Sequence, residues 1–161
     1  MNYINIIPTS CVDFTGWSTV LQVSHCTHMC KGCFNESSWS KNAGDLFTEG
    51  TYQELLTYAS KLYITNVVIQ GGEPLSPLNY QEMINLCRRI KKELPNKNIV
   101  MFSGYTYEEI LQDLLREPIL DCVNYLMDGR FRIDLPTNKP FRGSHNQVLH
   151  KIDKGVSVER S

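Results

Sequence analysis

Short runs of β-branched and apolar residues alternate with amphipathic segments of helical periodicity along this chain of 161 residues. We predict four strands, at residues 19–24, 66–70, 98–102 and 121–127. Strands that alternate with helices are typical of parallel strands joined by right-handed crossovers. The alternation therefore favours an α/β fold in which the carboxyl ends of the strands share one edge of the sheet.

Three helices are expected in the connections. Their start signals, in chain order, are Thr51 with Glu54, Ser76 with Pro77, and Thr106 with Glu109. The first and third pairs have the spacing of a capping box, and the second places a proline in a first helical turn. The spacing of the apolar residues in the third helix predicts an inward face formed by Ile110, Leu111, Leu114 and Leu115.

Chain length limits the architecture further. Eight strand–helix units need roughly 250 residues, so a closed barrel of that kind is excluded. We expect a single domain over residues 1–161, built as a partial (βα) barrel with mostly parallel strands. The polar segment 151–161 is expected to be a loosely ordered tail.

Composition excludes several classes of partner. The formal net charge of -1 gives no electrostatic reason to expect nucleic acid or an anionic membrane. The first residues show no basic leader with an apolar run, and no segment approaches the roughly 18 apolar residues of a membrane span. We therefore expect a cytoplasmic protein that acts on a small molecule or on another protein.

Six cysteines are present, and three of them, Cys26, Cys30 and Cys33, fall within eight positions. In a reducing compartment such a cluster binds metal more often than it forms disulfides. The three thiolates can ligate three irons of a cubane cluster and leave the fourth iron without a cysteine. A structural zinc site that recruits His25 or His28 as its fourth ligand is the alternative.

Residues suited to ligand binding follow the other expected strand ends. Gly71 and Gly72 lack a β-carbon and let a main chain approach a ligand closely, although a turn between strand and helix needs such glycines too. Glu73 offers an acceptor for a cationic group. Ser103 can hydrogen-bond a ligand, and Asp128 can accept from a ribose hydroxyl, but each also suits a tight turn.

The cysteine loop followed by Gly71-Gly72-Glu73-Pro74 resembles the radical S-adenosylmethionine superfamily. The resemblance implies that the amino and carboxylate groups of S-adenosylmethionine chelate the open iron of a [4Fe-4S] cluster. It implies that residues 71–73 hold the methionine amine, and that Gly32, Cys33 and Phe34 lie against the ligand. An electron passed through the cluster would then release a 5'-deoxyadenosyl radical.

Within that superfamily the chain is similar to the activating proteins of anaerobic ribonucleoside-triphosphate reductase. The shared features are Met1-Asn2-Tyr3, Cys33-Phe34-Asn35, Ser38-Trp39, Ser103-Gly104-Tyr105, Asp128-Gly129-Arg130-Phe131 and Arg142-Gly143-Ser144 with Asn146-Gln147. The resemblance implies a glycyl radical formed on the large subunit of the reductase, and a reductant such as flavodoxin.

Two other functions remain open on the residues alone. One is an activase for a different glycyl radical enzyme of the pyruvate formate-lyase type, and the other is a non-catalytic zinc-binding interaction module. Cys87 and Cys122 fit core packing, and His145 and His150 are assigned to the surface or to loops. Arg142 lies in a basic segment that suits ligand contact, partner docking or simple solvation.

Overall fold

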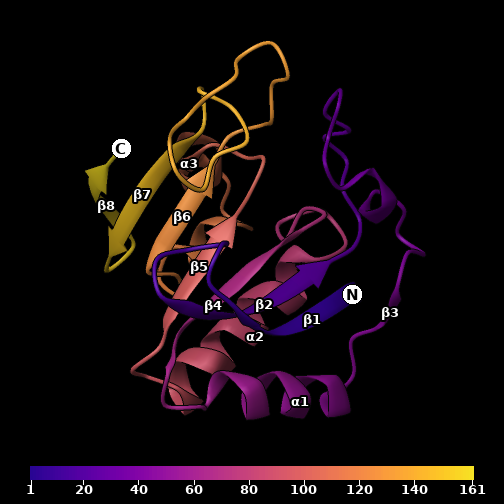
Figure 1. Ribbon diagram of the computed structural model, residues 1–161, viewed down its shortest axis with the longest axis vertical. Helices are drawn as coiled ribbons and strands as arrows, with labels where there is room; N and C mark the ends of the chain where they lie inside the picture. The colour runs from indigo at the N-terminus through magenta and orange to yellow at the C-terminus, as the bar shows by residue number, and fades with distance from the viewer.

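The computed structural model describes residues 1–161 and is built around one sheet of eight strands, in the order β3-β1-β2-β4-β5-β6-β7-β8 (Figure 1). The strands are β1 (Asn2–Ser10), β2 (Trp17–Val23), β3 (Asp45–Leu46), β4 (Ile64–Gly71), β5 (Asn98–Phe102), β6 (Tyr125–Asp128), β7 (Val148–Asp153) and β8 (Val156–Arg160). The helices are α1 (Glu49–Ala59), α2 (Tyr80–Glu93) and α3 (Tyr107–Gln112), with short 3-10 turns at Glu36–Ser38 and Glu117–Ile119. The predicted α/β class is confirmed.

The sheet is mixed, and the expectation of mostly parallel strands is wrong. Strands β2, β4, β5 and β6 pair in parallel, which gives three parallel pairings, whereas the four pairings toward the two edges are antiparallel. The connections between β1 and β2 and between β7 and β8 are short, and short connections can join only antiparallel neighbours. The observed architecture is an open mixed sheet, and a partial barrel is not confirmed.

The two faces of the sheet are covered differently. Leu21, Ile69 and Met101 belong to a core of 24 buried residues that also includes residues of α1, α2 and α3. Side chains alternate along strands, so Val68 and its register partners Val20 and Val100 point to the opposite face. There Phe14, Tyr125 and Phe141 pack against the valines. Helices therefore cover one face, and loops cover the other.

The helix boundaries correct several predictions. Helix α1 begins earlier than expected, because Thr48 is its N-cap and forms the capping box with Thr51. The predicted box of Thr106 with Glu109 is confirmed at the start of α3. Of its predicted inward face only Ile110 is buried. Leu111 is 47% exposed, and because the helix ends at Gln112, Leu114 and Leu115 are 87% and 58% exposed. No helix combines the length and the apolar character that crossing a membrane requires.

Helix α2, in contrast, begins later than expected, at Tyr80. Residues 74–79 form turns instead of a first helical turn, and the buried Asn79 explains why. Its side-chain amide donates to the carbonyl oxygens of Ser24 at 2.7 Å and Glu73 at 3.0 Å. These bonds tie the start of α2 to the ends of β2 and β4.

The segment 151–161 is not a loose tail. It completes β7 and forms β8, the last hairpin of the sheet. His150, which was expected on the surface or in a loop, is only 1% exposed and stacks on the Tyr107 ring. The Ser157 backbone N–H donates to the Tyr107 hydroxyl at 3.2 Å, so the hairpin is fastened to α3.

Candidate metal centre and ligand pocket

A pocket of about 200 Å³ opens at the carboxyl ends of the central strands. It lies between the loop after β2 and the loop that joins β6 to β7, which rise beyond the same end of the sheet in Figure 1. Eight predicted site residues line it: Cys26, Cys30, Cys33, Phe34, Gly71, Gly72, Glu73 and Ser103. The fold thus brings together the residues from three expected strand ends.

The cysteine loop leaves β2 at Val23 and turns back sharply. Met29 and Gly32 adopt left-handed backbone angles, with φ of 47° and 73°, and the Cys33 N–H donates to the Cys30 carbonyl at 3.1 Å. The Cys26 N–H donates to the Trp39 carbonyl at 3.2 Å, which ties the loop to the segment that follows it.

All three cysteines are free and partly exposed to the pocket. Burial raises the pKa of the thiols of Cys26 and Cys30. Without a metal, the thiols of Cys26 and Cys30 are therefore held in the protonated form at neutral pH. Because the metal ligand is the thiolate, binding iron must release these protons.

The two histidines that could complete a zinc site have other hydrogen-bond partners. His28 has both ring nitrogens within hydrogen-bond distance of other side chains, and His25 lies outside the pocket lining with its Nδ1 2.8 Å from Ser76 Oγ. Three thiols without a fourth protein ligand are what a cubane with one open iron requires.

Glu73 is buried and fully engaged with protein donors. Its Oε1 accepts from Ser103 Oγ at 2.8 Å and the Leu75 N–H at 2.9 Å, and its Oε2 accepts from the Gly104 N–H at 2.7 Å. His28 Nε2 lies 3.0 Å from the same Oε2. A carboxylate offers about four acceptor positions. In this arrangement protein groups occupy all four positions of Glu73, and the Ser103 hydroxyl donates to Glu73.

The glycine pair has a structural requirement of its own. Gly71 has φ of 111°, and a β-carbon there would lie 2.7 Å from the Val23 carbonyl oxygen. At Gly72 it would lie 2.8 Å from the His25 carbonyl oxygen. The N–H of Gly72 donates to Val23 at 2.7 Å. The two glycines thus let the end of β4 pack directly on the base of the cysteine loop.

Two predicted ligand contacts lie outside the pocket. Gly32 is not part of the lining, and a β-carbon there would meet the Ile133 side chain. The Asp128 carboxylate accepts from the N–H groups of Tyr107 at 2.6 Å and Val148 at 3.2 Å, and it faces His150. Asp128 is therefore occupied on the other side of β6, and the structure gives no support for a ribose contact.

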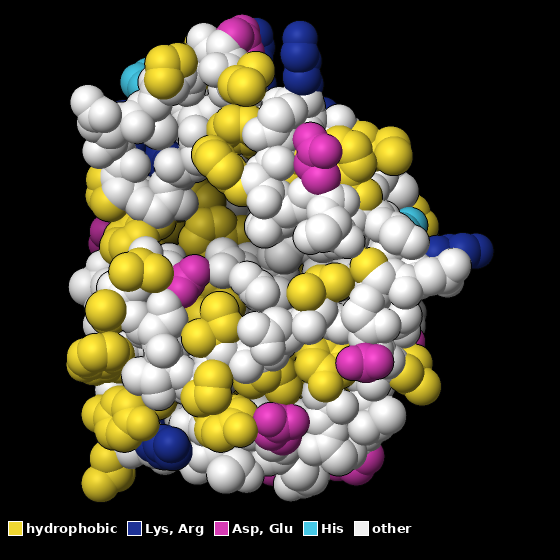
Figure 2. All heavy atoms as spheres, turned by 45° about the vertical axis from the view of Figure 1, so that its right-hand side comes forward, with side chains coloured by type: hydrophobic (Ala, Val, Ile, Leu, Met, Phe, Trp, Pro, Cys, Tyr) yellow, Lys and Arg dark blue, Asp and Glu magenta, His cyan; other side chains and the backbone are white.

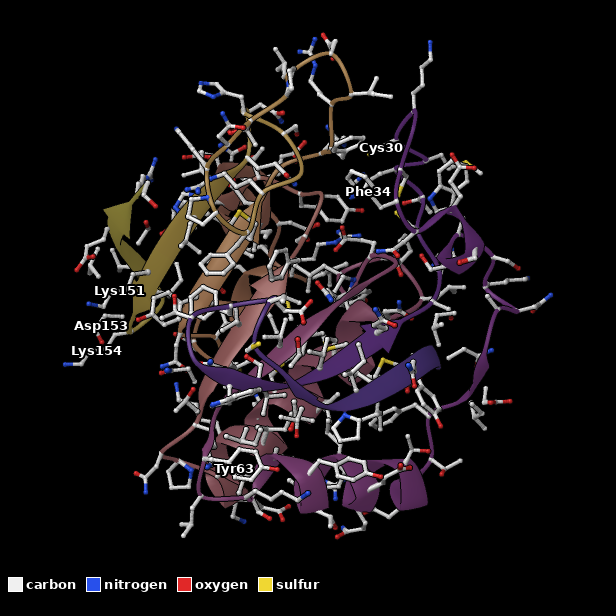
Figure 3. The ribbon with its side chains drawn as sticks, in the orientation of Figure 1. Cys30, Phe34, Tyr63, Lys151, Asp153 and Lys154 are labelled. Atoms are coloured by element: carbon white, nitrogen blue, oxygen red, sulfur yellow. The ribbon has the colours of Figure 1, made fainter.

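Aromatic side chains that sequence reasoning missed complete the pocket. Phe102, Phe131 and Phe141 line it together with Phe34, whose ring centroid is 5.1 Å from that of Phe131. Figure 3 shows Phe34 and Cys30 on the side of their loop that faces the loop after β6. Gln70 and Phe102 were detectable, because period two places them on the same sheet face as Val68 and Val100.

The remaining missed lining residues are His28, Asn35, Trp39, Gly104, Gly129, Gly143 and Gln147. Figure 2 shows the face that comes forward from the right-hand side of Figure 1. Hydrophobic side chains are spread over this face, and it is hollowed in its upper half. Arg142 is not in the lining, since its guanidinium donates to backbone carbonyls at Gln147, Pro140 and Ser161 and closes its own loop.

Comparison with known proteins identifies the family. A family model described as a 4Fe-4S single cluster domain matches residues 12–150. The chain is 40% identical over 156 residues to the anaerobic ribonucleoside-triphosphate reductase-activating protein of Enterobacteria phage T4, with 97% of each chain covered. It is 35% identical to the protein of that name in Haemophilus influenzae and 34% identical to that of Escherichia coli K12. Each of these matches extends over 155 residues and covers 94% of this chain and 99% of the relative.

The chain belongs to the family of anaerobic ribonucleoside-triphosphate reductase-activating proteins. The matched range includes the cysteine loop, the end of β4 and the whole loop between β6 and β7. Every residue that lines the pocket, from Cys26 to Gln147, therefore lies inside the 4Fe-4S single cluster domain.

Proposed function

We propose that this protein activates an anaerobic ribonucleoside-triphosphate reductase by forming a glycyl radical on its large subunit. It would be a radical S-adenosylmethionine oxidoreductase that holds one [4Fe-4S] cluster through Cys26, Cys30 and Cys33. One observation carries the proposal: the three free thiols and the glycine-rich end of β4 line the same pocket. The family membership supports the choice of the reductase as partner.

The bound groups supply the radical chemistry. One electron from a reductant such as flavodoxin would pass through the cluster and break the bond between the sulfonium and the 5'-carbon of S-adenosylmethionine. The products would be methionine and a 5'-deoxyadenosyl radical. This radical would take a hydrogen atom from a glycine Cα and leave 5'-deoxyadenosine and the glycyl radical. The protein contributes orientation and a suitable environment. Its first task is to give up the thiol protons of Cys26, Cys30 and Cys33 and hold three irons.

The methionine end of the ligand needs an acceptor for its ammonium group. The four protein donors around Glu73 leave that carboxylate without a free position. The neighbouring Gly72 carbonyl oxygen accepts no hydrogen bond from the protein, and Gly72 lines the pocket. We assign the ammonium contact to this main-chain carbonyl, with Glu73 as the residue that holds the strand end in shape.

The adenosyl end suits the aromatic part of the pocket. Phe34 and Phe131 form a tilted pair between the two loops, and Phe102 and Phe141 line the pocket too. Aromatic faces stack with a purine base.

The decisive experiment is electron paramagnetic resonance on the anaerobic reductase after incubation with the reconstituted protein, S-adenosylmethionine and a reductant. A glycyl radical signal that depends on all components is expected, and its absence would remove the proposal. Exchange of the reductase for a pyruvate formate-lyase tests the alternative activase. Metal analysis tests the zinc module, because one zinc in a colourless anaerobic sample would replace the expected four or so irons.

A further inference from the structure

His28, between Cys26 and Cys30, is held on all sides by the ends of three other strands. Its Nε2 lies 3.0 Å from Glu73 Oε2 after β4, and its Nδ1 lies 3.1 Å from Arg130 Nε after β6. Its ring meets the edge of Tyr105 at a centroid distance of 4.6 Å after β5. The imidazole is only 6% exposed.

The hydrogen-bond partners fix the tautomer of this imidazole. A guanidinium can only donate, so Nδ1 must accept from Arg130 and carries no proton. Nε2 therefore carries the proton and donates it to the Glu73 carboxylate. The ring fits only because Gly104 has no side chain: a β-carbon there would lie 2.3 Å from His28 Cδ2.

The cysteine loop has few other side-chain bonds to the strand ends. His28 is the only non-cysteine side chain between Cys26 and Cys33 that hydrogen-bonds outside the loop. The main chain is joined to the end of β4 only at the base of the loop, through the Gly72 and Glu73 N–H groups. Beyond that base, the hydrogen bond between His28 and Glu73 is the one that joins the loop to residues 71–73.

The spacing between the cysteine loop and residues 71–73 matters for the proposed reaction, on which the following inference rests. The open iron and the acceptor for the methionine ammonium belong to different segments, and a chelating ligand must reach both. We propose that His28 is a positioning residue for S-adenosylmethionine. Its bond to Glu73 sets the distance between the cysteine loop and residues 71–73. At this distance the ligand can bind the open iron and the end of β4 at the same time. It touches neither reacting atom.

Two substitutions separate the two bonds. His28→Gln places an amide N–H near the position of Nε2 and can still donate to Glu73. His28→Asn places an amide oxygen near the position of Nδ1, so it keeps the Arg130 bond and loses the one to Glu73. Both are reconstituted anaerobically beside the unmodified protein and compared for iron content, for the dissociation constant of S-adenosylmethionine, and for the change of the reduced-cluster resonance when the ligand is added.

We expect all three proteins to hold about four irons. His28→Asn should bind S-adenosylmethionine about tenfold or more weakly, because without the bond to the buried Glu73 carboxylate the cysteine loop is no longer held at its distance from residues 71–73. Its cluster resonance should also change less on ligand addition, whereas His28→Gln should keep most of both responses. Unchanged affinity and resonance in His28→Asn would overturn the inference. Failure of the unmodified protein to bind iron or ligand would instead overturn the proposed function.

Discussion

His150 Nε2 lies 3.0 Å from Asp128 Oδ2, and both side chains are buried where β6 meets β7. The pair continues to Ser157 on β8, whose Oγ is 2.9 Å from His150 Nδ1. A buried carboxylate that also accepts two backbone N–H groups stabilises the fold strongly, because its loss leaves those donors without partners. Asp128 is thus the residue that fastens the C-terminal hairpin to the parallel part of the sheet.

The first prediction follows from this network. Asp128→Ala should lower the free energy of unfolding by about 3 kcal/mol in urea denaturation, since several buried donors lose their acceptor. Asp134→Ala is the matched control, as its carboxylate is exposed and pairs only with Arg132, and it should cost under about 1 kcal/mol. At low temperature, where folded Asp128→Ala protein persists, its affinity for S-adenosylmethionine should be unchanged. A large loss of affinity would restore the ribose contact that the structure does not support.

The second prediction concerns iron binding. Alanine at any one of Cys26, Cys30 or Cys33 should abolish stable cluster assembly, measured as iron per chain and as brown absorbance after anaerobic reconstitution. Cys11→Ala removes an exposed cysteine outside the pocket and should keep the full iron content. If one of these three alanine variants retained iron and cleaved S-adenosylmethionine, the three cysteines would not be the ligands of the cluster.

Cluster assembly should also depend on pH in a defined direction. Burial raises the pKa of the Cys26 and Cys30 thiols, so the apoprotein holds these protons to higher pH than a free cysteine does. Iron binding must release them, and the apparent iron affinity should therefore rise with pH across the neutral range. Competition with a chelator whose own proton affinity is known measures this, and a flat or falling profile would contradict the protonated resting state.

Local signals in the sequence were sufficient for the centre of the fold. Residues 98–102 form β5 as predicted, because an apolar run between turn residues has one simple interpretation. The capping box at Thr106 and Glu109 needs only residues of its own turn. The edge strands gave no such signal: β8 has mostly exposed side chains, so no buried face marks its period.

The pocket residues divide in the same way. The cysteine loop was predicted from its spacing, and Gly71-Gly72-Glu73 from its place after a strand. The pairing of Glu73 with His28 instead joins residues 45 positions apart and depends on the packing of three strand ends. Asp128, predicted as a ribose contact, does not line the pocket, and the period of its strand explains its position. Leu126 faces the helices, and period two puts Asp128 on that face and Gly129 on the pocket side.

The fourth prediction tests the close packing at the end of β4. Gly71→Ala should lower the free energy of unfolding by about 2 to 3 kcal/mol, because φ of 111° is strained for alanine and its β-carbon would meet the Val23 backbone. Gly50→Ala lies in α1, where the added β-carbon would make only an ordinary contact, 3.6 Å from Thr48 Oγ1, and the change should instead be neutral or stabilising by up to about 1 kcal/mol. Equal effects in urea denaturation would show that the backbone approach at Gly71 is not a constraint.

The last prediction concerns how a polypeptide reaches the pocket. The two loops that border the pocket expose apolar side chains, with Met29 at 61%, Phe34 at 81% and Ile133 at 58% exposure. We expect a glycine of the reductase to approach across this apolar rim, so these side chains should be buried when the partner docks.

Ile133→Asp places a charge on the rim outside the pocket lining. It should reduce glycyl radical formation about tenfold or more by weakening partner binding, while cleavage of S-adenosylmethionine without the reductase continues at the normal rate. Leu62→Asp, at a residue 99% exposed beyond the end of α1, is the matched control and should change neither rate. If Ile133→Asp lost cleavage of S-adenosylmethionine and glycyl radical formation equally, the residue would shape the pocket instead of the docking surface. If glycyl radical formation were unchanged, the reductase would dock elsewhere.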